Sequence, residues 1–194
     1  MSISNIPQQE TSLITSDPQY IQSLTSHITT IHDSDELQSL MSDVTETLDR
    51  EMVQSLLDAL YPLCLDTRDI HSLTAASATC LHIAPALAAD NIVITAILRG
   101  LRTDDPFAQL TAATALADLP GTVRIQPEVL SALVSCAVDD RADTRARCIA
   151  LGALACAHND PSVRITVTEI AQDCSIPKLK MEAAGLLSLW RHLK

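Results

Sequence analysis

The chain has 194 residues, enough for one domain with a sizeable core, and 47% of them are hydrophobic although only 2% are aromatic. Burial must come from Leu, Ile, Val and Ala, which favours closely packed helices over β-sandwiches. The net charge of −11 argues against binding to nucleic acid or to an anionic membrane, because clusters of Lys and Arg recognise both.

Nothing in the chain points to a membrane or to secretion by a cleaved signal. No apolar run approaches the roughly 20 residues of a membrane span, and the first residues lack the basic and apolar regions of a secretory signal. The six cysteines show no CxxC spacing and lie in apolar surroundings, so we expect free thiols. We therefore predict a cytoplasmic protein with reduced cysteines.

The N-terminal part is acidic and follows its own pattern. Residues 1–15, rich in Ser, Thr and Gln, are predicted to be disordered. Residues 16–49 are predicted to form capping helices, because two apolar stripes recur there at helical spacing. The stripes are Tyr20, Ile21, Leu24, Ile28 and Ile31, followed by Leu37, Leu40, Met41, Val44 and Leu48.

Charge is distributed unevenly along the chain. The first 49 residues contain no Lys or Arg, and their acidic side chains are Glu10, Asp17, Asp33, Asp35, Glu36, Asp43, Glu46 and Asp49. This acidic arm either caps the rest of the molecule or lies in a basic groove of this chain or of another copy, where it would block that groove.

Residues 50–194 repeat with a period of 35 residues. Four segments align without gaps and share columns of apolar and small residues. The columns are Ala78, Ala113, Cys148 and Ala183; Leu81, Leu116, Leu151 and Leu186; Cys80, Ala115, Ala150 and Gly185; and Leu119, Leu154 and Leu189. Because the columns fall at i, i+3 and i+6 on one helical stripe, each unit is predicted to be a helix, a turn and a second helix.

Prolines mark the expected helix starts. Asp105-Pro106 and Asp160-Pro161 each place a capping carboxylate before a proline at the first helical position, and Pro127 and Pro177 mark further starts.

Two other features of these units are interpreted as framework. The acidic pairs at 104–105 and 139–140 recur at one place in successive units, so they are interpreted as turn caps rather than as catalytic acids and bases. Gly152 and Gly185 fall inside predicted helices, where we expect close packing to require them.

These columns resemble those of the HEAT-repeat, armadillo-like family. The residues that carry the resemblance are Asp139 or Asp140 in the turn, Arg145 in the basic column, Cys148 in the place of Ala, Leu151 and Leu154; in the next unit they are Lys180, Ala183, Leu186 and Leu189. Leu110 and Ala75 depart from the pattern by standing in the basic column. The resemblance implies an all-α, right-handed α-solenoid of about four HEAT-like helical hairpins, with an atypical N-terminal helical pair and second helices that line a concave surface.

Motifs that carry catalysis are absent from the sequence. It contains no GxGxxG or P-loop pattern, no GxSxG and no HExxH. His71, Cys80 and His82 are the nearest approach to a metal cluster, but residues two apart on a helix point in different directions, so we interpret them as packing and surface residues. We therefore expect no enzymatic activity, no metal and no cofactor.

A modest basic groove on the predicted second helices is the candidate binding site. Its expected contacts to a partner are Arg141, Arg145, Arg147, Lys178, Lys180, Glu182 and Trp190. A structural interpretation stands beside it: Arg145 and Lys180 would form a ladder of ion pairs between turns, the other charges would belong to a solvated face, and Trp190 would cap the core.

The sequence therefore predicts a non-enzymatic protein–protein interaction module, namely an adaptor, scaffold or chaperone that binds a peptide or helix of acidic character. Two alternatives stay open. One is a bacterial secretion-system component or secreted effector, suggested by the Ser-, Thr-, Ile- and Gln-rich N-terminus without basic residues. The other is a HEAT-like lyase subunit or another enzyme accessory protein, which the family resemblance allows.

Overall fold

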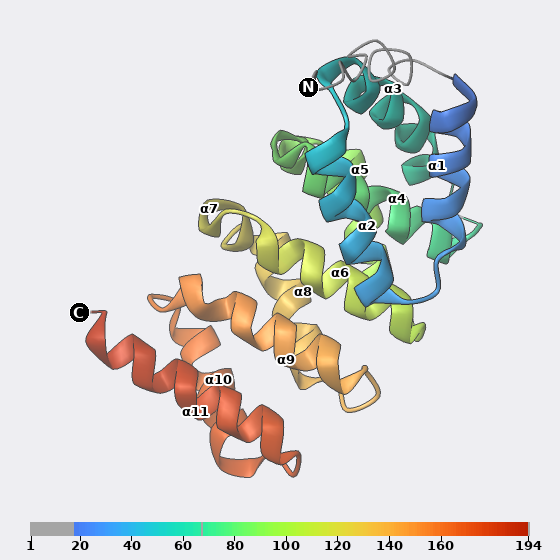
Figure 1. The fold of residues 1–194 in the computed structure, drawn as a ribbon. Helices are drawn as coiled ribbons and strands as arrows, with labels where there is room; N and C mark the ends of the chain where they lie inside the picture. The colour runs from blue at the N-terminus through green and yellow to red at the C-terminus, as the bar shows by residue number, and fades with distance from the viewer. Residues whose placement is uncertain (1–17, 67, 194) are drawn as a thin grey trace, which may run out of the picture.

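The computed structural model describes residues 18–66 and 68–193, and all regular secondary structure in them is helical, which confirms the all-α prediction. The predicted disorder of residues 1–15 lies outside the described residues. The elements, labelled as in Figure 1, are α1 (Pro18–Thr30), α2 (Ser34–Thr47), α3 (Arg50–Leu60), η1 (Tyr61–Leu65), α4 (Ile70–Ile83), η2 (Pro85–Ala89), α5 (Asn91–Leu101), α6 (Pro106–Asp118), α7 (Gly121–Arg124), α8 (Pro127–Val138), α9 (Thr144–Ala153), η3 (Leu154–Ala157), α10 (Pro161–Asp173) and α11 (Pro177–His192).

From α3 onward the helices pack as two adjoining rows. In one row α4 packs on α6, α6 on α9, and α9 on α11; in the other, α3, α5, α8 and α10 each pack on the helix of the first row that follows them in the chain. Figure 1 shows this order, with α10 and α11 at the opposite end of the molecule from α1 and α3. We call α4, α6, α9 and α11 the second helices, and we call the side that carries Ala75, Leu110, Arg145 and Lys180 the second-helix face.

The repeated leucine column forms the core between the rows. Leu81, Leu116, Leu151 and Leu186 are all buried, as are most of the small residues beside them. Burying a leucine side chain stabilises the fold by about 1.5–3 kcal/mol, so each member of this column contributes to holding the two rows together. Leu189 is an exception within its own column: it is 48% exposed, because among the described residues no helix packs beyond α11.

Aspartates and prolines start most helices, as the sequence predicts. Asp105 accepts a hydrogen bond from the Ala108 amide at 2.8 Å, and Asp160 accepts one from the Ser162 amide at 2.8 Å, each ahead of a proline at the first helical position. These carboxylates satisfy amides that have no partner inside the helix.

The turn before α9 differs from the prediction. The cap of α9 is Asp143, whose carboxylate accepts from the Arg145 and Ala146 amides at 2.9 and 3.0 Å. Asp139 instead accepts from the Arg141 amide within the turn, and Asp140 pairs with Arg147. The helix starts later than predicted because the side chain that reaches its free amides stands four residues further along.

The expectation that Gly152 and Gly185 are needed for close packing is wrong. A Cβ atom at either position would meet nothing within 4 Å, so both glycines face open space. Close packing requires glycine at Gly100 of α5 instead, where a Cβ would overlap the Thr74 side chain of α4 and lie 2.7 Å from its Cγ2. Gly100 is buried at this contact.

The cysteines and the helix lengths agree with two further expectations. All six cysteines are free, and Cys64, Cys80 and Cys136 are buried. Within the described residues, none of the helices has both the length and the apolar character needed to cross a membrane.

Candidate functional site

The acidic helix α2 lies across the second helices α4 and α6 (Figure 1). Its buried residues Leu37, Met41 and Val44 recur at helical spacing and face the protein, as predicted from the apolar stripe. Its acidic side chains Asp35, Glu36 and others stay near the surface. The chain thus places an amphipathic acidic helix on its own second-helix face.

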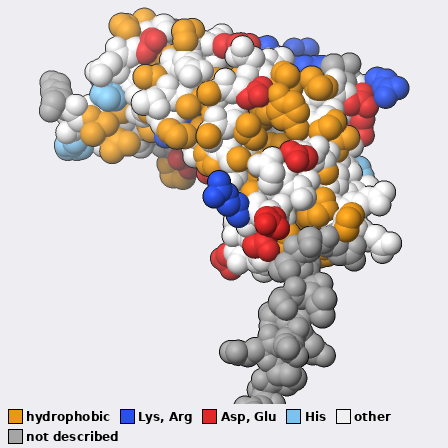
Figure 2. Space-filling view, turned by 90° about the horizontal axis from the view of Figure 1, so that it is seen from above, with side chains coloured by type: hydrophobic (Ala, Val, Ile, Leu, Met, Phe, Trp, Pro, Cys, Tyr) orange, Lys and Arg blue, Asp and Glu red, His pale blue; other side chains and the backbone are white. Residues whose placement is uncertain are grey.

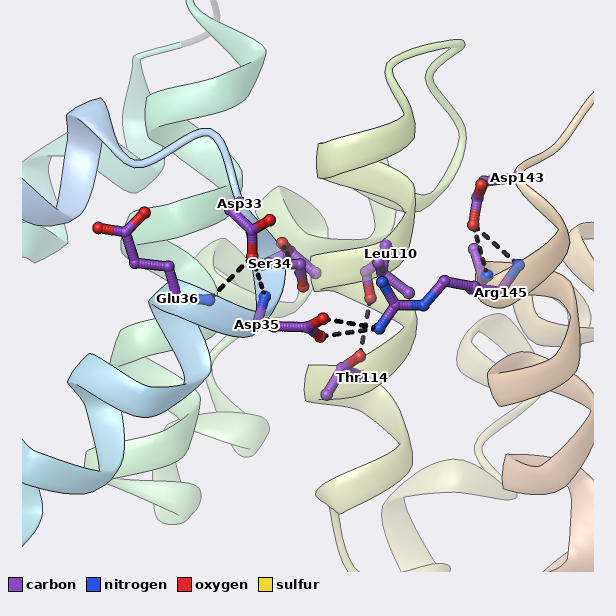
Figure 3. A network of polar contacts seen from close by, with 10 residues as sticks. Asp33, Ser34, Asp35, Glu36, Leu110, Thr114, Asp143 and Arg145 are labelled. Carbon is purple, nitrogen blue, oxygen red and sulfur yellow. Dashed lines mark hydrogen bonds and ion pairs between the residues drawn. The ribbon is translucent and has the colours of Figure 1, made fainter.

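A salt bridge continues this contact beyond α6. Asp35 of α2 accepts two hydrogen bonds from Nη2 of Arg145 on α9, at 2.8 and 3.0 Å (Figure 3). The Arg145 and Asp35 side chains are 57% and 65% exposed, so water screens the pair and it contributes little to stability. The hydrogen bond to Asp35 raises the pKa of Arg145, which stays charged. The main effect of the pair is to place the first turn of α2 against α9, and its effect on stability is secondary.

A carboxylate cap and a hydrogen bond between two hydroxyl groups hold the first turn of α2 beside this salt bridge. Asp33 caps the helix by accepting from the amides of Asp35 and Glu36 at 2.8 and 3.0 Å (Figure 3). Thr111 of α6 donates from Oγ1 to Oγ of Ser34 at 3.2 Å. The cap therefore holds the Asp35 carboxylate where it can reach Arg145.

Histidine and phenylalanine rings hold the turn that leads into α2. Nε2 of His71 in α4 lies 2.5 Å from the carbonyl oxygen of Ile31, and the His71 ring stacks on Phe107 of α6 with centroids 4.1 Å apart. The His32 ring also contacts the His71 ring, with centroids 4.2 Å apart and the two planes tilted by 46°. His71 therefore has a packing role, as the sequence predicts, but its partners 40 and 36 positions away could not be named from sequence spacing.

A hollow of about 230 Å³ remains between α2 and the second helices beneath it. Most of its lining is apolar. Its lining residues are Ser34, Leu37, Gln38, Met41, Ala78, Leu81, His82, Pro85, Thr111, Thr114, Ala115, Asp118 and Leu119. The surface beneath α2 is thus formed largely by α4 and α6. It includes Ala78, Leu81, Ala115 and Leu119 of the 35-residue columns.

Arg145, Lys178, Lys180 and Glu182 all lie at the surface of α9 and α11. Arg145 forms a salt bridge with Asp35 of α2, whereas the predicted ladder of ion pairs would link it to a neighbouring turn. Lys180 donates from Nζ to the carbonyl oxygen of Gln172 at 2.7 Å and keeps the rest of its ammonium group exposed.

Arg141 is exposed as well, with its side chain 83% accessible and paired with Asp139 at 3.4 Å. It stands in the turn before α9, not on the second-helix face.

Two predicted contacts are buried and hold the core together instead. Arg147 is 3% exposed and donates from Nε to the Ala137 carbonyl oxygen at the end of α8, at 3.2 Å. Trp190 is 2% exposed and donates from Nε1 to the Ala155 carbonyl oxygen at 2.9 Å, while the Arg164 guanidinium lies 5.6 Å from its ring centre. Neither side chain is accessible to a partner in this structure.

The polar link between neighbouring units comes from a residue that the sequence did not single out. The Gln109 side chain of α6 donates to the Thr103 carbonyl oxygen at 2.6 Å and accepts from the Asp143 amide at 2.8 Å. Gln109 is 5% exposed, so both bonds are sheltered from water. The sequence offered one signal for this link. Gln109 stands among alanines and threonines, and a glutamine buried there needs hydrogen-bond partners.

The environments of two buried thiols, Cys80 and Cys136, favour the protonated form. The hydrogen bond to Cys64 and burial together raise the pKa of Cys80, and burial raises the pKa of Cys136 to about 11. A protonated buried thiol is a small apolar group, not a nucleophile or a metal ligand. Among the described residues, no group of three or more His, Cys, Asp or Glu side chains could hold a metal ion.

Comparisons with known proteins do not assign a family. No family model, no curated protein and no solved structure matches this chain. The resemblance to HEAT repeats therefore stays a prediction from the 35-residue columns of the sequence.

Proposed function

We propose that this chain is a right-handed α-solenoid of about four HEAT-like hairpins and works as a non-enzymatic protein–protein interaction module in the cytoplasm. Its partner would be an acidic amphipathic helix bound on the second-helix face. One observation carries the proposal: the chain's own acidic helix α2 already lies on this face, with its apolar stripe on α4 and α6 and Asp35 on Arg145. A face that accepts one such helix has the chemistry to accept another.

The part of the face that stays accessible supports this chemistry. On α9 and α11, Arg145, Lys178 and Lys180 are exposed, and Ile149 beside them is only half-buried. Viewed from above (Figure 2), the molecule bends around a hollow between its N-terminal and C-terminal parts, with a basic side chain next to acidic ones at its corner. Apolar and basic groups side by side match a helix with an apolar stripe and acidic flanks.

A displayed library of amphipathic helices tests the proposal. We expect selection on the full chain to enrich acidic helices, whose binding weakens as salt rises because the flanking contacts are ionic. Hydrogen exchange on the complex should show added protection of α9 and α11. The paired change Lys178→Glu and Lys180→Glu should remove binding, whereas Arg68→Glu should leave it unchanged, since Arg68 is an exposed arginine paired with Asp66 in the turn before α4.

The proposal fails if selection yields helices without acidic residues, or if the selected helices protect other surfaces from exchange. It also fails if the double lysine change and Arg68→Glu affect binding equally, because the effect would then come from overall charge and not from this face.

A further inference from the structure

Two cysteines of neighbouring elements lie in contact inside the fold. Cys64 belongs to η1 and Cys80 to α4, and the Cys80 thiol donates a hydrogen bond to the sulfur of Cys64. Cys64 in turn donates from Sγ to the carbonyl oxygen of Leu60 at 3.8 Å. Both cysteines belong to the hydrophobic core. The pair is therefore a dithiol whose two sulfur atoms are already neighbours.

Packing in the repeat does not require sulfur at either position. The column that holds Cys80 holds Ala115, Ala150 and Gly185 in the following units. The position 35 residues after Cys64 is an arginine. Because equivalent positions of the other units accept different side chains, the two thiols are a property of this one unit and not of the repeat.

Cys64 lines a hollow of about 320 Å³ between η1 and α5. Leu65 lies beside it in the lining, and Ile92 and Ala96 line the hollow from α5. Cys64 is 5% exposed, whereas Cys80 is 0% exposed. A hollow of this volume admits molecules of the size of water. A small solute can therefore reach the Cys64 sulfur, and Cys80 lies behind it.

The two thiols also differ in how readily they ionise. The hydrogen bond from Cys80 lowers the pKa of Cys64, although burial and the charge of Asp90 act in the opposite direction. The same hydrogen bond and burial raise the pKa of Cys80. Since the thiolate is the form that attacks an oxidant, Cys64 is the nucleophile of the pair, and Cys80 stays protonated beside it.

We infer that Cys64 and Cys80 form a redox site whose substrate is a small hydroperoxide, of which hydrogen peroxide is the simplest. The Cys64 thiolate attacks one peroxide oxygen, the O–O bond breaks and hydroxide leaves, so Cys64 is oxidised to a sulfenic acid. The Cys80 sulfur then attacks the Cys64 sulfur, and the departing hydroxide takes the Cys80 proton to form water. Two thiols and one hydrogen peroxide thus give one disulfide and two molecules of water.

The disulfide joins η1 to α4 covalently, and a dithiol reductant restores the two thiols. In a reducing compartment such a bond is transient, as it is in redox-sensing proteins. This inference does not depend on the helix binding proposed above, because neither cysteine belongs to the proposed binding face.

Peptide mapping of the full chain tests the inference. The chain is treated with hydrogen peroxide, its remaining thiols are blocked with iodoacetamide, and it is digested with trypsin. Trypsin cleaves after Arg68, so Cys64 and Cys80 fall into separate peptides, residues 51–68 and 69–99. We expect mass spectrometry to find these two peptides linked, and dithiothreitol to separate them.

Cys136 is the matched control within the same chain, because it is also 5% exposed but burial raises its pKa to about 11. We expect peroxide to oxidise Cys64 more than about tenfold faster than Cys136, since each pKa unit changes the thiolate fraction by about tenfold. In the Cys80→Ser chain the sulfenic acid loses its neighbouring thiol. Dimedone, which labels sulfenic acids, should therefore label Cys64 strongly in this variant and weakly in wild type.

Three results overturn the inference. The first is a wild-type chain whose peptides 51–68 and 69–99 stay unlinked after peroxide treatment, a measurement that needs no variant. The second is oxidation of Cys64 no faster than that of Cys136. The third is a set of disulfides that link Cys64 to other cysteines as often as to Cys80, because contact between the two thiols would then not direct the bond.

Discussion

Three glycines show how much a single residue depends on its neighbours. Gly100, Gly152 and Gly185 all lie inside helices, and helix propensity treats them alike. Their surroundings differ, since Gly100 touches the Thr74 side chain while the other two face open space. Close helix packing is therefore a property of the α4 and α5 contact, not of the columns that the sequence repeats.

We expect Gly152→Ala and Gly185→Ala each to raise the free energy of unfolding by up to about 1 kcal/mol, because alanine restricts the unfolded chain and favours helix. Gly100→Ala should lower it by about 1–3 kcal/mol, because the added methyl group overlaps Thr74. Urea denaturation of the three variants measures both signs. A stabilising Gly100→Ala would show that the contact relaxes without cost.

The carboxylate of Asp69 makes the stability of the fold depend on pH. It caps α4, and a hydrogen bond from the Ser72 hydroxyl, followed by bonds from the Ser72 and His71 amides, lowers its pKa. A lowered pKa means that the folded state prefers the carboxylate. Its contribution to stability is therefore present above the unfolded pKa of about 3.9 and is lost as the pH falls through the lowered folded pKa.

The change Asp69→Asn tests this linkage, because asparagine caps a helix about as well but does not ionise. We expect the variant to lose less stability than wild type between about pH 5 and pH 2 in urea denaturation. Ser72→Ala should also lose less stability than wild type over this pH range, because it removes the hydrogen bond that lowers the pKa of Asp69 most. Identical pH profiles for wild type and Asp69→Asn would contradict the linkage.

At the scale of elements, the sequence predicted helix starts better than helix partners. Pro106 and Pro161 begin helices as expected, because a proline and the preceding aspartate act within one turn. The arginines of α9 show the opposite case: neighbours at 145 and 147 were assigned to one groove, yet Arg145 lies at the surface and Arg147 is buried. The sequence pattern does not separate them, because the difference depends on where α8 ends.

Arg147 joins α9 to the end of α8, and its loss should weaken that joint. We expect Arg147→Ala to lower the free energy of unfolding by about 2 kcal/mol or more, since it leaves the Ala137 carbonyl oxygen without its partner and removes buried side-chain atoms. Arg145→Ala is the matched control and should lower the free energy of unfolding far less, because its ion pair is exposed to water. Equal effects in guanidinium denaturation would contradict the separate roles.

Placement of the acidic arm also belongs to the scale of elements. The sequence left two roles open for it, a cap or an occupant of a basic groove. In the structure α2 has features of both, because Leu37 is fully buried against the protein while Asp35 pairs with Arg145. Its buried stripe makes it part of the core, so its role as a cap is built into the fold.

At the scale of the whole molecule, one continuous hydrophobic core joins the described helices from α1 to α11. We expect Leu151→Asp to unfold this stack cooperatively, because Leu151 is fully buried in the middle of the row and an unpaired carboxylate cannot be accommodated there. Leu189→Asp, in the exposed part of α11, should change stability by no more than about 0.5 kcal/mol. Circular dichroism and melting distinguish the two, and a Leu151→Asp chain with unchanged helicity and melting would refute the register of the repeat.

The sequence alone was enough to predict that the chain is helical, where α6, α8, α10 and α11 begin, and which leucine column is buried. These are local or periodic properties, since caps act within a turn and a 35-residue period places equivalent side chains in equivalent surroundings. Three features depend on how the helices pack: α2 lies on α4 and α6, Asp35 pairs with Arg145 across 110 positions, and Gly152 faces open space. No period relates the arm to α9, so that contact exists only once the helices have packed.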